Sequence, residues 1–301
     1  MGNKKKHTAY TFVMHWKFLF KLVPATLILT LSCCNAAPNS GENKESLFGS
    51  FFDMPAVEEN DASSSLKDTD PSVAPSPFWD VGDVDISEID VRRKLISFTF
   101  DDSPSRTLEN IYAVFAAFNE ENPDCKASAT VFFNGYRFDG QTPHLLYTAG
   151  VLGFELGNHT FAHRDLTTLS PEEIAAEIDK TDELLKRADG KERHLFRAPF
   201  GKLDESVKAC VKTPIIDWTI DTLDWMGKSE QDIYDSVFLQ KFSGAIVLMH
   251  DGYGNTVSAL KRLLPDLKAD GYQVVSVSKM IKAHGCNFER GKVYIRARKG
   301  H

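Results

Sequence analysis

The sequence predicts an α/β fold in which parallel strands alternate with helices. Short apolar runs rich in β-branched and aromatic residues recur along the chain, and amphipathic helical patterns separate most of them. Polar clusters stand at the ends of several of these runs, which is where barrel folds place their chemistry. Of the 301 residues, 42% are hydrophobic and 26% are charged, an ordinary globular composition that excludes collagen-like, coiled-coil and wholly disordered chains.

The predicted elements begin at about residue 92. The run KLISFTF predicts a strand over 94–100, and apolar residues on one face predict a helix over 107–118. The residues Ser-Pro-Glu-Glu at 170–173 predict the start of a long helix, and Gly190 predicts its end. Further strands are expected at the short apolar runs 129–133, 154–156, 194–196, 214–218, 245–249 and 273–277.

Residues 1–37 are predicted to be a secretory or lipoprotein signal rather than part of the fold. They hold five Lys and no acidic residue, and the apolar run 22–31 is too short to span a bilayer. The processing of this segment is left open. The stretch LSCC resembles a lipobox with Cys34 or Cys33 as a membrane anchor, whereas cleavage just beyond it would release a soluble protein. We therefore expect an extracytoplasmic protein, secreted or lipid-anchored at the outer face of the membrane.

Residues 38–90 are predicted to be a disordered acidic linker, followed by one folded domain over 91–301. The linker holds 13 acidic residues and two Lys, with too little apolar surface to offset the entropy of ordering it. The domain is nearly neutral, with 28 basic and 29 acidic residues, which excludes nucleic acid as a partner. Its last stretch, 279–301, forms a basic tail. Beyond the signal only three Cys remain, so a disulfide framework does not hold the domain together.

Two polar clusters suggest a metal site. Asp101 and Asp102 follow the first predicted strand, and adjacent carboxylates repel unless a cation or a division of roles compensates. His159 and His163, four residues apart, would lie on one face of a helical turn and could chelate one ion. Asp102 and the two His would form a three-ligand site of the kind that a catalytic divalent metal needs. Taken singly, the acids could equally be a surface turn and the His pair a coincidence.

Further candidates follow along the chain. Arg197, beside a rigid turn, could clamp a carboxylate such as Asp101, or it could be an ordinary surface Arg. His250 ends an apolar strand next to an acid, so it could stay protonated and act as a general acid, or it could be structural. Trp225 could form the wall of a sugar groove or fill the core.

In their order and spacing these clusters resemble the five motifs of the NodB-like polysaccharide deacetylases, carbohydrate esterase family 4. The motifs are Thr99-Phe100-Asp101-Asp102, His159-Thr160-x-x-His163, Arg197-x-Pro199-Phe200, Asp221-x-x-Asp224-Trp225 and Leu248-x-His250-Asp251. The resemblance covers about residues 92–285 and implies a distorted, incomplete (β/α) barrel as a single catalytic domain. One departure is Ser103, which stands where the family usually has Gly and would be strained if its φ were positive.

The resemblance also implies a role for each motif residue. It implies a divalent metal, Zn²⁺ first with Co²⁺ or Ni²⁺ as alternatives, held by Asp102, His159 and His163. Asp101 would be the general base, oriented by Arg197, and His250 would be the general acid, tuned by Asp224. The N–H of Phe200 would help to form an oxyanion hole, while Trp225 and Leu248 would line the pocket for the acetyl methyl group.

The expected function is that of an exported, metal-dependent polysaccharide deacetylase. A general acid suits N-acetyl groups because an amine leaves poorly without a proton, so N-acetylglucosamine of peptidoglycan or of a chitin-like polymer is the expected substrate. An O-acetyl esterase acting on acetylated xylan is the first alternative. A non-catalytic sugar-binding or metal-binding envelope protein is the second, and the intact set of motif residues argues against it.

Overall fold

The computed structural model describes residues 76–298. The predicted signal over 1–37, with Cys33 and Cys34, lies outside the described residues, as does most of the predicted linker. Among the helices of the described part, none is long and apolar enough to cross a bilayer.

Nine strands form one sheet in the described residues, and every strand pair in it is parallel. The strand order is β6-β7-β1-β2-β3-β4-β5-β9, with β8 paired to the start of β1. The strands are β1 (Lys94–Ser103), β2 (Thr130–Phe133), β3 (Glu155–Asn158), β4 (Leu195–Phe196), β5 (Ile215–Ile216), β6 (Ile220–Asp221), β7 (Ile246–His250), β8 (Tyr272–Val274) and β9 (Val293–Tyr294). This parallel half-barrel confirms the predicted fold class.

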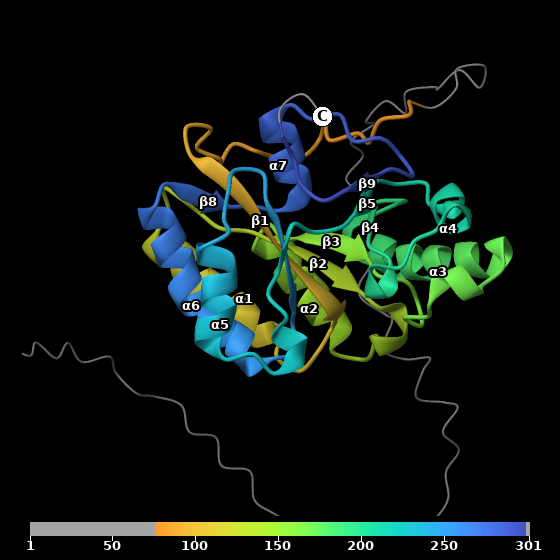
Figure 1. The fold of residues 1–301 in the computed structure, drawn as a ribbon, viewed down its shortest axis with the longest axis horizontal. Helices are drawn as coiled ribbons and strands as arrows, with labels where there is room; N and C mark the ends of the chain where they lie inside the picture. The colour runs from red at the N-terminus through yellow and green to blue at the C-terminus, as the bar shows by residue number, and fades with distance from the viewer. Residues whose placement is uncertain (1–75, 299–301) are drawn as a thin grey trace, which may run out of the picture. The chain divides into compact units, whose positions relative to one another are not determined.

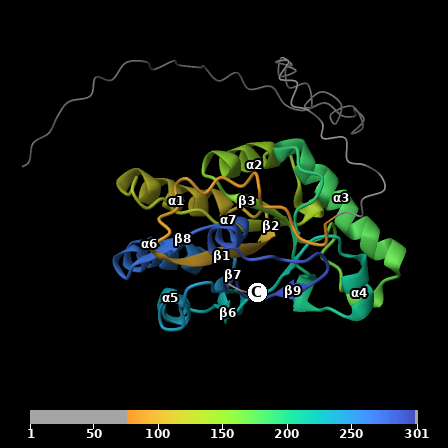
Figure 2. The ribbon, with the colours of Figure 1, turned by 90° about the horizontal axis from the view of Figure 1, so that it is seen from above.

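Helices join successive strands and cover the sheet (Figures 1 and 2). They are α1 (Leu108–Glu121), α2 (Thr142–Val151), α3 (Pro171–Asp189), α4 (Glu205–Cys210), α5 (Glu230–Phe238), α6 (Gly254–Ala269) and α7 (Val277–His284). Figure 1 shows α1, α5 and α6 grouped beside β1, with α3 and α4 at the other end of the sheet. The predicted ends of α3 are confirmed, because Ser170 and Glu173 form a capping box and Gly190 closes the helix at φ 74°.

The two faces of β1 contribute to different parts of the molecule. Ile96, Phe98 and Phe100 pack into the largest apolar cluster, together with residues of α1 and α6. Leu95 packs on the opposite face with residues of α7. Because side chains alternate along a strand, the buried Thr99 and Asp101 belong to this second face. One face of β1 therefore packs into the apolar core, and the opposite face carries the carboxylate of Asp101.

The folded part of the chain begins before residue 91. Residues 76–90, assigned from the sequence to the linker, lie against the domain: the Trp79 N–H donates to Phe288 O over 2.7 Å, and Trp79 and Ile89 pack beside the α7 cluster. Part of the predicted basic tail is also ordered. Lys282 of α7 donates to the carbonyls of Gly82 and Val84 over 2.6 and 2.7 Å, so the tail binds the segment that precedes the sheet.

Two elements escaped the sequence prediction for the same reason. Strands β6 and β9 have two residues each, too few to show any periodicity. The equally short β4 and β5 were expected only because they lie within the apolar runs 194–196 and 214–218. Only pairing with β7 and β5 defines β6 and β9.

Cys125, Cys210 and Cys286 are all free thiols, as expected for a domain not held together by disulfides.

Candidate active site

The predicted site residues meet at the carboxyl edge of the sheet. Asp101 of β1 stands opposite His250 of β7, and Phe133 of β2 stands opposite Asn158, the last residue of β3. Asn158 in turn stands opposite Phe196 of β4. Because these strands are parallel, the residues that follow them emerge at the same edge. Clusters separated by as many as 149 positions in the sequence therefore form one site.

Asp102, His159 and His163 form a three-ligand cluster. Their ligand atoms all lie within 4.8 Å of one another, and Asp102 Oδ1 is 3.2 Å from His163 Nε2 and 3.8 Å from His159 Nε2. Asp102 Oδ1 is buried and accepts no hydrogen bond within residues 76–298. A buried carboxylate oxygen without a donor, facing two imidazole nitrogens, fits a divalent cation. Burial and the neighbouring His159 lower the pKa of His163, which favours the neutral ring that a metal needs.

The expectation of a helical turn between the two His was wrong. Residues 159–163 form a loop after β3, in which Thr160 and His163 have φ values of 69° and 53°. Thr160 Oγ1 accepts the His163 N–H over 3.1 Å, and the Thr160 N–H donates to Asn158 Oδ1 over 2.9 Å. Asn134, on the adjacent strand end, donates to His159 O over 2.6 Å. These bonds, rather than helical periodicity, hold the two imidazoles together.

Ser103, which stands where the family usually has Gly, fits the end of β1 without backbone strain. The positive φ, 65°, falls on Asp102, so Ser103 carries no left-handed strain, and the bond to Pro104 is cis. The buried Ser103 hydroxyl donates to Asp251 Oδ2 over 2.9 Å, a bond that Gly could not make. The N–H of Ser105 donates to the same oxygen over 2.9 Å.

Asp251 is a supporting residue that the sequence analysis did not single out. Its side chain is fully buried, and burial raises its pKa to about 6 despite the bonds from Ser103 and Ser105. It joins the loop after β7 to the end of β1, which carries Asp102, and to Ser105 just beyond that strand. Its place next to His250 in the last motif was the one available signal.

Arg197 clamps Asp101, as its spacing suggested. Its Nη1 donates to Asp101 Oδ1 and to Thr99 Oγ1, each over 2.7 Å, and its Nε donates to Ile216 O over 2.8 Å. The guanidinium is 4.3 Å from the ring centre of Phe132. Burial alone would raise the pKa of Asp101, but the charges of Arg197 and of the nearby His residues outweigh it, so the pKa lies below its usual range. Asp101 is thus held as a buried carboxylate.

His250 is paired with Asp224. Its Nδ1 donates to Asp224 Oδ1 over 2.8 Å, and its backbone N–H donates to Asp224 Oδ2 over 2.9 Å. Thr256 donates to Oδ2 as well, over 2.7 Å. Burial lowers the pKa of His250, but the bond to Asp224 and the charge of Asp101 outweigh it, and the pKa lies above its ordinary value. The raised pKa favours the protonated imidazole, in which Nε2 carries the proton that faces away from Asp224.

Three residues border the site. Phe200 has φ 60°, is 62% exposed, and places its ring 4.6 Å from that of His163. Trp225 is 51% exposed, so it does not fill the core, whereas Leu248 of β7 is buried.

Comparison with known proteins places the chain in a family. A family model described as polysaccharide deacetylase matches residues 88–213. A peptidoglycan-N-acetylglucosamine deacetylase of Bacillus cereus is 33% identical over 205 residues, which cover 65% of this chain and 92% of that protein. The chain belongs to the polysaccharide deacetylase family. This carbohydrate esterase family 4 deacetylase also resembles the peptidoglycan-N-acetylmuramic acid deacetylase PdaC of Bacillus subtilis, with 30% identity over 192 residues.

A solved structure extends the comparison. The Xyl-CE4 domain of a multidomain xylanase, from the hindgut metagenome of Trinervitermes trinervoides, aligns with a TM-score of 0.62 and 27% identity, covering 68% of this chain and 98% of that one. The match to PdaC covers 64% of this chain and 40% of the length of PdaC. The shared part is therefore the deacetylase domain.

Proposed function

We propose that this deacetylase is an exported, metal-dependent enzyme that hydrolyses N-acetyl groups of N-acetylglucosamine in peptidoglycan or a chitin-like polymer, releasing acetate and a free amine. The observation that carries the proposal is the juxtaposition of the three-ligand cluster with the Asp101–Arg197 and His250–Asp224 pairs at one edge of the sheet. Export is proposed from the charge and hydropathy pattern of residues 1–37.

Asp102, His159 and His163 would hold the metal, with Zn²⁺ as the first choice and Co²⁺ or Ni²⁺ as alternatives. The chemistry that such an ion supplies when bound is polarisation of a carbonyl and acidification of a water. Asp101 then takes the proton of the attacking water. Its carboxylate is suited to this because Arg197 keeps it ionised and fixes its orientation.

His250 protonates the leaving amine. Its Nδ1 is engaged by Asp224, which leaves Nε2 as the proton-donating nitrogen, and its pKa lies above the ordinary value. The step favours an amide substrate because an alkoxide leaves an ester with less help than an amine needs. The backbone N–H of Phe200 would stabilise the oxyanion, and one such donor typically contributes about 3–4 kcal/mol. Leu248 and Trp225 would line the pocket for the acetyl methyl group.

Two alternatives stand beside this proposal. The likeness to a domain of a xylanase favours an O-acetyl esterase acting on acetylated xylan as the second candidate. A non-catalytic sugar-binding or metal-binding role is opposed by the complete set of acids, His and Arg at the site.

Acetate release by the metal-loaded full-length protein tests the proposal. Chitooligosaccharide, peptidoglycan and acetylxylan are offered side by side, with Asp101→Asn as the control that should lose turnover and keep metal binding. Release from the N-acetyl substrates alone supports the proposal, and release from acetylxylan alone favours the esterase. Turnover by Asp101→Asn near the wild-type rate would overturn the assignment of the base.

A further inference from the structure

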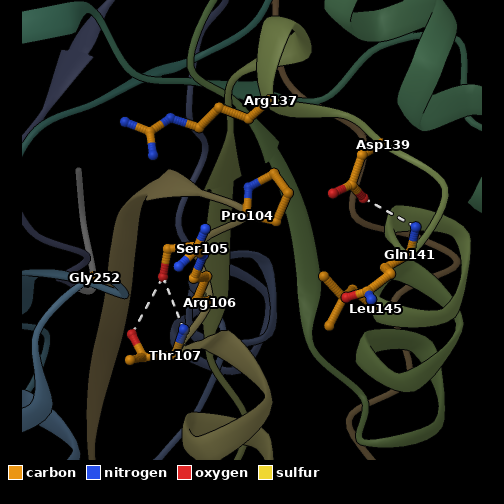
Figure 3. Close-up of a pocket in the computed structure, with 9 residues that line it drawn as sticks. All are labelled: Pro104, Ser105, Arg106, Thr107, Arg137, Asp139, Gln141, Leu145 and Gly252. Carbon is orange, nitrogen blue, oxygen red and sulfur yellow. Dashed lines mark hydrogen bonds between the residues drawn. The ribbon is translucent and has the colours of Figure 1, made fainter.

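A pocket of about 490 Å³ is lined by residues that follow the site residues closely in the sequence (Figure 3). Its wall comes from the loops after β1, β2 and β7, three strands adjacent in the sheet. Pro104 lies two positions beyond Asp102, and Gly252 lies two positions beyond His250. The pocket therefore opens at the same edge of the sheet as the site, and a glycan bound at the site can extend a side group into it.

Two guanidinium groups give the pocket its charge. Arg106 and Arg137 both line it, and within residues 76–298 neither forms an ion pair with a carboxylate. Arg137 is held by an aromatic residue instead: its Nε donates to Tyr136 Oη over 3.0 Å, and its guanidinium lies 5.3 Å from the centre of that ring. Because a guanidinium has five N–H donors, most of those on Arg137 remain for a ligand.

The one acidic residue of the lining, Asp139, is occupied by its own loop. Its Oδ1 accepts the N–H groups of Gln141 and Thr142 over 2.9 and 3.2 Å, and the Thr142 hydroxyl over 3.1 Å. In Figure 3 the Asp139 carboxylate points toward Gln141, whereas the Arg137 side chain extends above Pro104 and away from Asp139. The lining thus contains two guanidinium groups and one carboxylate, and that carboxylate already accepts hydrogen bonds from Gln141 and Thr142.

We propose that this pocket binds a carboxylate of the acetylated glycan, next to the sugar that is deacetylated. The inference rests on the proposed function and narrows its substrate to a glycan that bears carboxylates. Peptidoglycan offers one of two sources at each muramic acid: the lactyl carboxylate where no stem peptide is attached, or the carboxylates of the stem where its amide bond has consumed the lactyl one. Chitin offers neither. Arg recognises a carboxylate through two parallel N–H···O bonds, and the pocket is large enough to admit the arm that carries the group.

The test compares matched glycans on the metal-loaded full-length protein. One pair has a free lactyl carboxylate or its amide, and the other has an L-Ala-D-Glu stem or its diamide. The wild-type protein is expected to show a higher kcat/KM for the acid than for the amide in at least one pair, and that pair names the source. Arg137→Ala and Arg106→Ala should each reduce this ratio by about tenfold, mainly through KM.

Matched variants separate a contact from general electrostatics. Arg187→Ala removes an exposed guanidinium of α3, outside the pocket lining, and should leave the ratio unchanged. Arg137→Lys keeps the charge but not the planar fork, so it should restore only part of the ratio. Equal kcat/KM for acid and amide in the wild-type protein, or equal losses in Arg187→Ala and Arg137→Ala, would overturn the inference.

Calorimetric binding of the same glycans keeps the inference testable without turnover. If the wild-type protein releases no acetate from any glycan, the proposed function fails, while the binding ratio of acid to amide still decides whether the pocket selects a carboxylate. A ratio near one in binding refutes the pocket even in an active enzyme.

Discussion

Removing Arg197 should destabilise the fold through a carboxylate that the variant leaves behind. Arg197 and Asp101 are 1% and 4% exposed, and the Nη1–Oδ1 distance between them is 2.7 Å. Arg197→Met fills a similar volume but leaves the Asp101 charge buried without its guanidinium partner. It also removes the donor to Ile216 O. Deleting one partner of a buried ion pair typically costs about 3–5 kcal/mol.

A double-mutant cycle of Arg197→Met and Asp101→Asn measures how much of the lost stability comes from the interaction between the two charges. Asp101→Asn removes the buried anion, so adding Arg197→Met to that variant should cost less than it does in the wild-type protein. We expect the double variant to be more stable than the sum of the two single losses predicts, by about 2 kcal/mol. Lost packing against Phe132 would be the same in both backgrounds and cancels in the cycle.

Chemical unfolding of the four metal-free proteins measures the cycle, because a bound ion would add its own stabilisation. Arg262→Met is the matched control. It removes an exposed Arg that lies 3.1 Å from Glu230 and 4.4 Å from the Tyr234 ring centre, and such a surface pair contributes at most about 1 kcal/mol. A coupling energy below about 0.5 kcal/mol, or equal losses in Arg197→Met and Arg262→Met, would refute the reasoning.

Three further predictions rest on separate contacts. Asp224→Asn removes the negative charge that helps to raise the pKa of His250, so the alkaline limb of the kcat/KM profile should move to lower pH. An unmoved limb would contradict the assignment of the acid. His194 is buried between the carboxylates of Asp182 and Asp189, and its hydrogen bonds to them raise its pKa although burial alone would lower it. A raised pKa in the folded state stabilises the fold at low pH. The wild-type protein should therefore lose stability relative to His194→Gln as the pH rises above about 6.5. Parallel unfolding free energies from pH 5 to 9 would refute that role. Gly244→Ala places a Cβ 2.0 Å from Ala297 O at φ 95°, so a loss of at least about 2 kcal/mol in urea unfolding is expected, and a loss below 0.5 kcal/mol would contradict it.

The sequence by itself determined the α/β class, the main strands and the residues of the site. Apolar runs marked seven of the nine strands of the described residues, and a capping pattern marked both ends of α3. These signals are local, because burial periodicity and helix capping act over a few residues. Five ordered motifs then picked out Asp101, Asp102, His159, His163 and His250, all of which lie at one edge of the sheet.

Only the tertiary structure decided how those residues are held. The loop that carries the two His is held in part by Asn134, 25 positions before His159, and the bond from Ser103 to Asp251 joins residues 148 positions apart. That no carboxylate of residues 76–298 forms an ion pair with Arg106 or Arg137 likewise depends on which acids folding brings near them. Sequence patterns report what a residue prefers locally, whereas hydrogen-bond partners, ion pairs and pockets are set by chain segments that only folding brings together.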